Sequence, residues 1–383
     1  MTEYHFTEPL DILYLRGNRL FADASTPGEA LMPPWPSMAA GALRSQILAT
    51  HQIDAGKFAV DQVALPLHLQ ESLGTPSKPG SFRISDFLLA KVRDQQIDDV
   101  YLPLPADVIV QNNRQLIYYL QPESLPSGLL SSAPCQHLPV LRSEKPAKPE
   151  GGIWINAAGI QAWLNAEPLK NEHLVLSGDL WKLDARLGIT LAPEARTTVE
   201  SQLYTVETVA LARGIGFLSG VSGAPGLLPQ QSLVRLGGDG RGAQQYKVAW
   251  QRPKPKWEII DQQKRFRLLL TTPGLFEAGW LLPGMRQNAN GFQWQTDDFS
   301  ARLITASVAR ADTISGWDIA AHQPKPALKS VSSGSVYWFD QFEGDVNALG
   351  KLVEQSLFAI SDYPDRKRRA EGFNNIMIAA WPL

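Results

Sequence analysis

A short glycine-rich stretch is the part of the sequence best suited to bind an anion. It covers residues 236–241 and reads LGGDGR. Glycine tolerates left-handed backbone conformations, in which successive N–H groups point toward one acceptor, and arginine adds a planar cationic fork. We therefore expect Gly237, Gly238, Gly240 and Arg241 to bind a phosphate group.

Basic residues are concentrated around and beyond this stretch. From Arg235 to Arg267 there are nine Lys and Arg against three Asp and Glu, whereas the whole chain has a net charge of −2. Tyr246, Trp250 and Trp257 lie among them, as in surfaces that pair phosphates and stack bases. The further cations that we expect to contact nucleic acid here are Arg235, Lys247, Lys254 and Lys256. The alternative is that the tryptophans are core residues and the cations form an ordinary solvated face.

A second basic run lies near the C-terminus. Arg366, Lys367, Arg368 and Arg369 are consecutive, and Gly372 follows them. Most runs of like charge are solvated surface faces, which is the ordinary interpretation here. The functional interpretation is a second glycine turn whose cations contact a nucleic-acid backbone.

The residue patterns of common enzymes are missing from the sequence. No two of the six histidines are four residues apart, there is one cysteine, and neither GxxxxGK[ST] nor GxSxG occurs. In the LGGDGR stretch, Asp239 stands alone, where two-metal nucleotidyl transfer needs an acidic pair. We predict no catalytic residue, no metal and no cofactor. The alternative is a metal-independent endoribonuclease with His51 as general acid or base, although a histidine at a helix C-terminus is also favoured by the helix dipole.

Hydrophobic periodicity indicates the elements that position these residues. Leu10–Arg16 is apolar and β-branched and predicts a strand, and apolar residues at helical spacing predict a helix over Met38–His51. From about residue 53 to residue 200 the pattern is irregular and rich in proline, which indicates a large insertion.

The last third of the chain has a clearer pattern. It predicts strands over 265–271, 301–310, 335–339 and 375–381, and helices over 274–281 and 346–358. The order βαββαβ is that of ferredoxin-like and RNA-recognition modules. Since a glycine turn precedes a strand in both halves, we predict an α+β fold of two ferredoxin-like (RRM-like) domains. They cover 1–256, with the insertion 53–200 and the glycine-rich loop 236–242, and 257–383.

Composition and targeting signals limit the class of protein. The chain has 383 residues, of which 44% are hydrophobic and 19% charged, a balance that excludes a disordered chain. A single cysteine, Cys135, fits a reducing compartment, and Met1–Asp11 lacks the basic residues of a signal peptide. The longest uncharged stretch, 214–234, is interrupted by glycines and prolines. We expect a cytoplasmic protein without a membrane segment.

Short segments spread over nearly the whole chain occur in a specific order. They are LDILYLRGN at 10–18, PPWPS at 33–37 with GALRS at 41–45, LDARLGI at 183–189, LGGDGR at 236–241, GWD at 316–318, PKP at 324–326, SGSVY at 333–337, and GFN at 372–374 with WP at 381–382. Together they resemble the RAMP proteins of CRISPR systems, in particular the third-subunit family of the type III-B Cmr effector complex.

This resemblance implies a non-catalytic RNA-binding subunit in antiviral defence. Such a subunit grips the 5′ tag of the guide crRNA and contacts the large polymerase-like Cmr subunit and a neighbouring backbone RAMP subunit. In the family the glycine-rich loop lies against guide RNA, which here corresponds to Gly237, Gly238, Gly240 and Arg241, and Arg44 matches another family position. Two alternatives stay open: a RAMP endoribonuclease that processes the crRNA precursor, and a structural adaptor without RNA contact.

Overall fold

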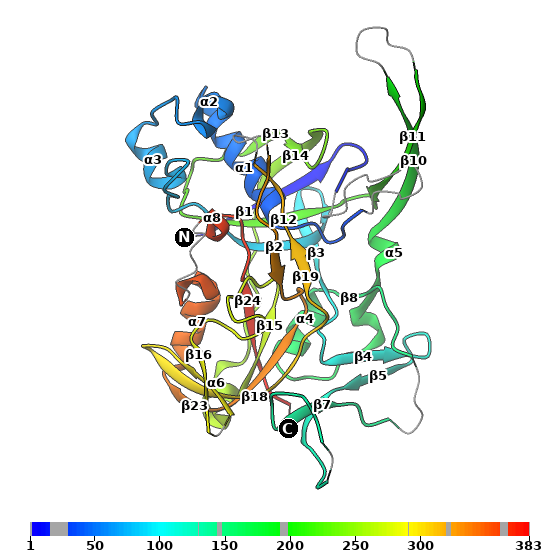
Figure 1. Ribbon diagram of the computed structural model, residues 1–383, viewed down its shortest axis with the longest axis vertical. Coiled ribbons are helices and arrows are strands. Elements are labelled where there is room, and N and C mark those ends of the chain that lie inside the picture. Colours follow the sequence, from blue (N-terminus) through cyan, green and yellow to red (C-terminus); the bar gives the residue numbers. More distant parts are fainter. Residues whose placement is uncertain are drawn as a thin grey trace.

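Antiparallel β-sheet dominates the computed structural model, and helices are few (Figure 1). The structure describes residues 2–15, 30–128, 130–143, 148–191, 198–289, 291–318, 323–360 and 367–382. The fold is therefore a mixed α/β fold built around two large sheets.

The first sheet has eight strands in the order β13-β14-β1-β12-β2-β3-β8-β9. In chain order they are β1 (Thr2–Pro9), β2 (Arg83–Arg93), β3 (Gln96–Pro103), β8 (Ile153–Ile155), β9 (Leu174–Leu176), β12 (Ile215–Ser222), β13 (Gln231–Leu236) and β14 (Arg241–Val248). All neighbouring strands are antiparallel. Every strand of this sheet comes from residues 2–248.

The second sheet has six strands in the order β16-β17-β18-β23-β15-β24. They are β15 (Phe266–Leu270), β16 (Met285–Asn288), β17 (Gly291–Gln295), β18 (Phe299–Ser307), β23 (Val336–Gly344) and β24 (Ile376–Ala380). These pairs are also antiparallel. The predicted strands near 265–271, 301–310, 335–339 and 375–381 are therefore confirmed.

The helices are short, and only two exceed nine residues. They are α1 (Ser37–Thr50), α2 (Ala55–Ala59), α3 (Leu67–Leu73), α4 (Ala157–Leu164), α5 (Ser177–Leu180), α6 (Trp257–Gln263), α7 (Val346–Gln355) and α8 (Lys367–Ala370), with 3-10 turns at Asn171–His173 and Leu357–Ala359. The helices predicted at 38–51 and 346–358 are confirmed as α1 and α7. Ser356, at φ +63°, ends α7 before the 3-10 turn.

Side chains on the two faces of β2 belong to different parts of the core. Leu89 packs with Leu43 and Ile47 of α1, which covers one face of the first sheet. Leu88, on the opposite face, belongs to the cluster that also contains Met377 of the second sheet. The two sheets therefore share a core, and the division into domains at residue 256 stays a prediction.

The described residues also form five two-stranded sheets. They are β4 (Val108–Gln111) with β5 (Leu116–Tyr119), β6 (Gln121–Ser124) with β7 (His137–Val140), β10 (Trp181–Leu191) with β11 (Thr198–Leu211), β19 (Asp312–Ile314) with β22 (Leu328–Ser330), and β20 (Trp317–Asp318) with β21 (Gln323–Pro324). The β10–β11 hairpin is the longest and extends well beyond the two sheets (Figure 1).

Three sequence predictions about these elements are wrong. The first strand is Thr2–Pro9, not Leu10–Arg16: β1 lies between β12 and β14, and the more apolar segment after it crosses to the base of the β10–β11 hairpin. Residues 274–281 are not helical: Gly274 forms an isolated β-bridge with Val331, and residues 277–280 form a turn. The expected irregular insertion 53–200 contains β2 and β3 of the first sheet, and β2 lacks alternation because it is buried on both faces.

Candidate nucleic-acid interface

The glycine-rich stretch forms the turn of the β13–β14 hairpin. Leu236 pairs with Arg241, and the four residues between them make the turn. Gly237, Asp239 and Gly240 have positive φ angles of 69°, 57° and 55°. Two of these three positions are glycines, as that conformation favours. The sequence prediction of a sharp glycine turn is therefore confirmed in geometry.

Residues 10–14 hold this turn in place. The Gly238 N–H donates to the Tyr14 carbonyl oxygen over 2.8 Å, and the Leu10 N–H donates to the Gly242 carbonyl oxygen over 3.0 Å. A Cβ atom on Gly237 would lie 3.0 Å from the Tyr14 carbonyl oxygen. Position 237 therefore needs a glycine for two reasons: the Tyr14 carbonyl oxygen leaves little room for a Cβ atom, and the φ angle is positive.

Arg241 lies over the ring of Tyr14. Its guanidinium carbon is 4.8 Å from the ring centroid, and Nη1 is 3.8 Å from Asp11 Oδ2. The Arg241 side chain is 33% exposed, and its Nε has no hydrogen-bond partner in the described part of the chain. The ion pair with Asp11 is long and exposed, so it holds the guanidinium weakly.

The turn adjoins the base of the β10–β11 hairpin. Leu13 exchanges two backbone hydrogen bonds with Val209, both of 2.9 Å, so residues 13 and 14 connect the two hairpins. Arg186 on β10 donates to Asp184 over 2.9 Å, and its pKa is raised first by that hydrogen bond and also by Asp11 and Tyr14. Tyr14 and Arg186 were not among the predicted site residues, although both lie in segments that carry the family resemblance.

The other four cations predicted near the turn differ in exposure and in ion pairing. Arg235 is exposed, and its aliphatic stem packs under Gly240. Lys247 Nζ lies 2.5 Å from Glu3 Oε1, and Lys256 Nζ lies 2.8 Å from Glu167 Oε1. Lys254 is exposed. Of these four, Arg235 is therefore the one adjacent to the turn without a carboxylate partner in the described residues.

Several residues counted in the basic region 235–267 are buried and do not form one surface. Arg252 forms a double hydrogen bond with Asp86, over 2.7 and 2.6 Å. Arg267 is 1% exposed and pairs with Asp107. Tyr246 is a core residue and Trp250 packs against Tyr4, which agrees with the alternative interpretation of these aromatics. The surplus of cations in the sequence thus overstates the charge presented to solvent.

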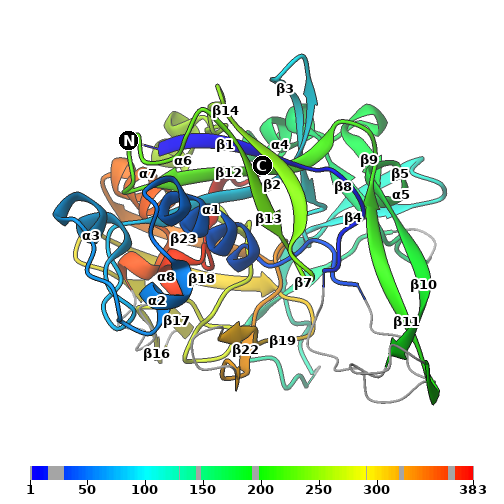
Figure 2. The same ribbon diagram turned by 90° about the horizontal axis from the view of Figure 1, so that it is seen from above.

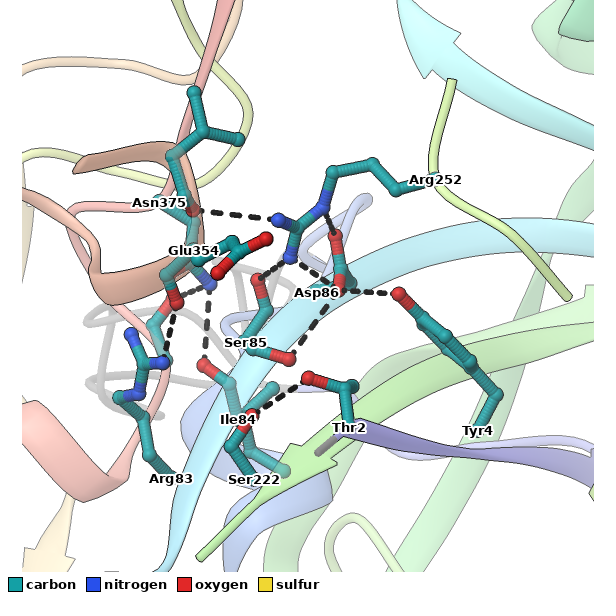
Figure 3. A network of polar contacts seen from close by, with 12 residues as sticks. Thr2, Tyr4, Arg83, Ile84, Ser85, Asp86, Ser222, Arg252, Glu354 and Asn375 are labelled. Carbon is teal, nitrogen blue, oxygen red and sulfur yellow. Dashed lines mark hydrogen bonds and ion pairs between the residues drawn. The ribbon is translucent and has the colours of Figure 1, made fainter. Parts of the chain in front are cut away.

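Figure 3 shows the network around Asp86 and Arg252. Tyr4 Oη donates to Asp86 Oδ2 over 3.2 Å, and Arg252 also donates to the Ser85 carbonyl oxygen. Burial lowers the pKa of Arg252, but the neighbouring Asp86 carboxylate outweighs burial and raises it. This network joins β1, β2 and the segment after β14 and is structural.

The C-terminal basic run is divided between core and surface. Arg366 lies outside the described residues, as does the side chain of Lys367. Arg368 is 1% exposed and pairs with Glu371 over 2.9 Å, so its guanidinium is not offered to a ligand. Arg369 is exposed. Arg44, on α1, is half-buried, and burial lowers its pKa against the opposing effect of Glu371.

Few groups in the described residues suit a catalytic centre. No group of three His, Cys, Asp or Glu side chains there is arranged to hold a metal ion, and no helix there is long and apolar enough to cross a membrane. His51 is exposed, and its ring lies 5.6 Å from that of His68, centroid to centroid. The sequence did not indicate this pairing, since 17 residues separate the two histidines.

Comparison with known proteins gives two kinds of similarity. The model of the family described as "CRISPR-associated protein (Cas_Cmr3)" matches residues 6–381. A chain from the cryo-EM structure of the type III-B Cmr-beta bound to cognate target RNA has a TM-score of 0.52 and 15% identity, covering 98% of this chain and 96% of that chain. A chain from the same complex with target RNA and AMPPnP, state 1, has a TM-score of 0.50 and 14% identity, covering 96% and 93%. No curated protein matches the sequence significantly.

Proposed function

Because the chain belongs to the Cas_Cmr3 family of CRISPR-associated proteins, we propose that it is the third subunit of a type III-B Cmr effector complex. In this role it is a non-catalytic, cytoplasmic RAMP protein that holds the 5′ tag of the guide crRNA in antiviral defence. The observation that supports RNA binding best is the fixed glycine turn of the β13–β14 hairpin, with Arg241 beside it.

The chemistry of the turn favours a phosphate group. The glycines hold the turn against Tyr14 and Arg235, and the Gly238 N–H already donates to the Tyr14 carbonyl oxygen, so the Arg241 guanidinium is the group that would bind the phosphate. Arg241 is held over Tyr14 and paired only loosely with Asp11, so a phosphate can replace Asp11 at the guanidinium. Since phosphate contacts position RNA without reading its sequence, recognition of a defined tag needs base contacts from other residues.

We also propose that each large sheet is a ferredoxin-like unit that lacks one helix. Within the first sheet, the order β14-β1-β12-β2 is the 4-1-3-2 order of such a unit, with α1 between its first and second strands. Within the second sheet, β24-β15-β23-β18 repeats that order, with α7 between the third and fourth strands. Among the described residues, the first unit has no helix between β12 and β14, and the second unit has no helix between β15 and β18.

The long β10–β11 hairpin supports the proposal of partner subunits. Leu183, Leu187 and Ile189 on β10 are 52%, 70% and 48% exposed, on a strand that extends beyond the core. Exposed apolar residues in a row are typical of protein interfaces. We propose that this hairpin contacts the neighbouring backbone RAMP subunit and that the large polymerase-like subunit binds another face of the protein.

The proposal is tested by measuring affinity for tagged guide RNA at several salt concentrations. Arg241→Ala should weaken binding about five- to tenfold and reduce the magnitude of the salt slope by about 0.7, the value for one phosphate of single-stranded RNA. Arg93→Ala is a matched control, because Arg93 is also exposed and weakly paired, 3.4 Å from Asp98, but lies at the tip of the β2–β3 hairpin. Equal affinities of the two variants for tagged RNA would contradict the proposed role of the turn. Absence of any crosslink between RNA and the native chain would favour a structural adaptor.

One observation favours a second function, that of an endoribonuclease acting on the crRNA precursor. His51 and His68 are both exposed and adjacent, and a pair of imidazoles can act as general base and general acid in metal-independent RNA cleavage. Incubation of the purified protein with precursor RNA in a chelator tests this function. Specific cleavage that is lost in both His51→Ala and His68→Ala would replace the non-catalytic proposal.

A further inference from the structure

Helix α8 is fixed rigidly on the first sheet. Arg368 anchors it from below, through Glu371 and through the Ser315 carbonyl oxygen, which accepts from both Nη atoms over 3.3 Å. After the helix, a Cβ atom on Gly372 would lie 2.7 Å from Ile84 Cβ, so the chain here lies directly on β2. Asn375 Nδ2 donates to the Ile84 carbonyl oxygen over 3.2 Å. The next residue along α8, Arg369, is therefore presented at a defined position on the surface.

Arg83 is at the start of β2, the strand that α8 contacts. One nitrogen, Nη2, donates to the Glu354 carbonyl oxygen near the end of α7. The other, Nη1, is buried and has no hydrogen-bond partner among the residues that the structure describes. An unpaired buried donor destabilises the folded chain, so an acceptor that reached Arg83 Nη1 would be bound favourably.

Arg83 lies among charges of both signs near α8. Burial, and then the charges of Arg369 and Arg252, lower the pKa of Arg83 to about 10, against the opposing charges of Asp86 and Glu354. Arg252 is already paired with Asp86. Glu371, the nearest carboxylate on the α8 side, is shared between Arg368 and Lys325, at 2.9 and 2.6 Å. Arg83 and Arg369 thus repel each other, and no described carboxylate forms an ion pair with either.

We propose that Arg369 and Arg83 form a second phosphate site, which takes a backbone phosphate of single-stranded RNA. An anion between them would relieve their repulsion and supply an acceptor for Arg83 Nη1. Two guanidinium forks suit a tetrahedral phosphate with several oxygens. This inference rests on the proposed function, because it extends the same RNA beyond the glycine turn.

The position of α1 favours an RNA backbone as the ligand of this site, in preference to a single free anion or an acidic peptide. Helix α1 packs against β13 on one side and α8 on another, so it lies between the glycine turn and Arg369 (Figures 1 and 2). Arg44 is on this helix. Cations therefore lie on three neighbouring elements, the β13–β14 turn, α1 and α8. Successive phosphates of one RNA strand can contact all three.

The site is tested with the full chain and a single-stranded RNA of mixed sequence, titrated at several salt concentrations. Arg369→Ala should weaken binding about fivefold and reduce the magnitude of the salt slope by about 0.7, the value for one phosphate of single-stranded RNA. Arg369 is exposed, so the variant should keep the native melting temperature. Arg83→Lys, which keeps the charge but removes the second fork nitrogen, should weaken binding about threefold. Arg286→Ala, an exposed arginine on the distant strand β16, is the control and should change neither quantity.

Parallel measurements separate this site from the glycine turn. If Arg241→Ala weakens binding and Arg369→Ala does not, the second site is wrong and the proposed function stands. If neither variant differs from Arg286→Ala, both proposals fail. Inorganic phosphate added as a competitor should lower RNA affinity of the native chain more than that of Arg369→Ala. Equal competition in both would overturn the assignment of a phosphate to Arg369.

Discussion

A buried ion pair between Asp107 and Arg267 offers a direct test of how the two halves of the chain are joined. Asp107 precedes β4, whereas Arg267 is in β15 of the second sheet, and Nη1 lies 2.5 Å from Asp107 Oδ2. Trp163 Nε1 donates to the other carboxylate oxygen over 2.9 Å. Arg267 also donates to the carbonyl oxygens of Trp163 and Ala380, over 2.8 and 3.0 Å. Asp107→Ala removes the only carboxylate in this network.

The expected loss is large because solvent does not screen the pair. The side chains of Asp107 and Arg267 are 2% and 1% exposed. Burial lowers the pKa of Arg267, and Asp107 opposes that effect, so Asp107→Ala leaves an uncompensated charge in the core. Breaking one partner of a buried pair costs about 3–5 kcal/mol, and we expect the free energy of unfolding to fall by about 4 kcal/mol. The double variant Asp107→Ala/Arg267→Met removes the charge as well and should recover about 2 kcal/mol.

Urea unfolding followed by circular dichroism and by tryptophan fluorescence measures this change. Trp163, one of the eleven tryptophans of the chain, contributes to the fluorescence from within this network, because the Arg267 guanidinium lies 4.2 Å from the centroid of its ring. A loss below about 1 kcal/mol in Asp107→Ala would refute the reasoning, since exposed pairs contribute only that much. Strict additivity of the two single variants would refute it as well.

Two further predictions concern stability. Burial lowers the pKa of His5 from 6.5 to about 4, with Glu3 and Lys247 nearby. The unfolded chain therefore takes up a proton that the folded chain rejects, and stability falls below pH 6.5. Between pH 7 and 5, urea unfolding of the native chain should lose about 2 kcal/mol more than that of His5→Gln. Gly372→Ala, which meets Ile84, should lower the melting temperature more than Gly128→Ala, where φ is also positive but nothing lies within 4 Å.

Local patterns in the sequence predicted the elements whose formation depends on nearby residues. The apolar spacing of residues 346–358 predicted α7, and the glycines of residues 236–241 predicted the turn that now joins β13 and β14. In both cases the deciding interactions lie within a few residues, through helix periodicity or through positive φ angles. Such features can be derived from one sequence.

Long-range pairing explains the predictions that failed. Strand β2 was placed in an irregular insertion because it is buried on both faces and so lacks the alternation of a half-exposed strand. Arg252 was counted as a surface cation, but its partner Asp86 is 166 residues away in the sequence. No local pattern announces a partner at that distance, so a count of charges along the chain cannot separate buried pairs from exposed cations.

The distinction between exposed cations and cations paired with carboxylates determines how strongly the protein can bind RNA. Cations paired with internal carboxylates, such as Lys247 and Arg368, do not neutralise a phosphate, so they displace no counterions from the RNA. The predicted site cations that remain available near α1 are few, chiefly the exposed Arg235 and Arg369 and the half-buried Arg241. The salt slope for single-stranded RNA should therefore be close to −2, about 0.7 for each of three phosphates, and not the steeper value that nine basic residues suggest. A slope steeper than about −4 would show that the paired lysines open to bind RNA.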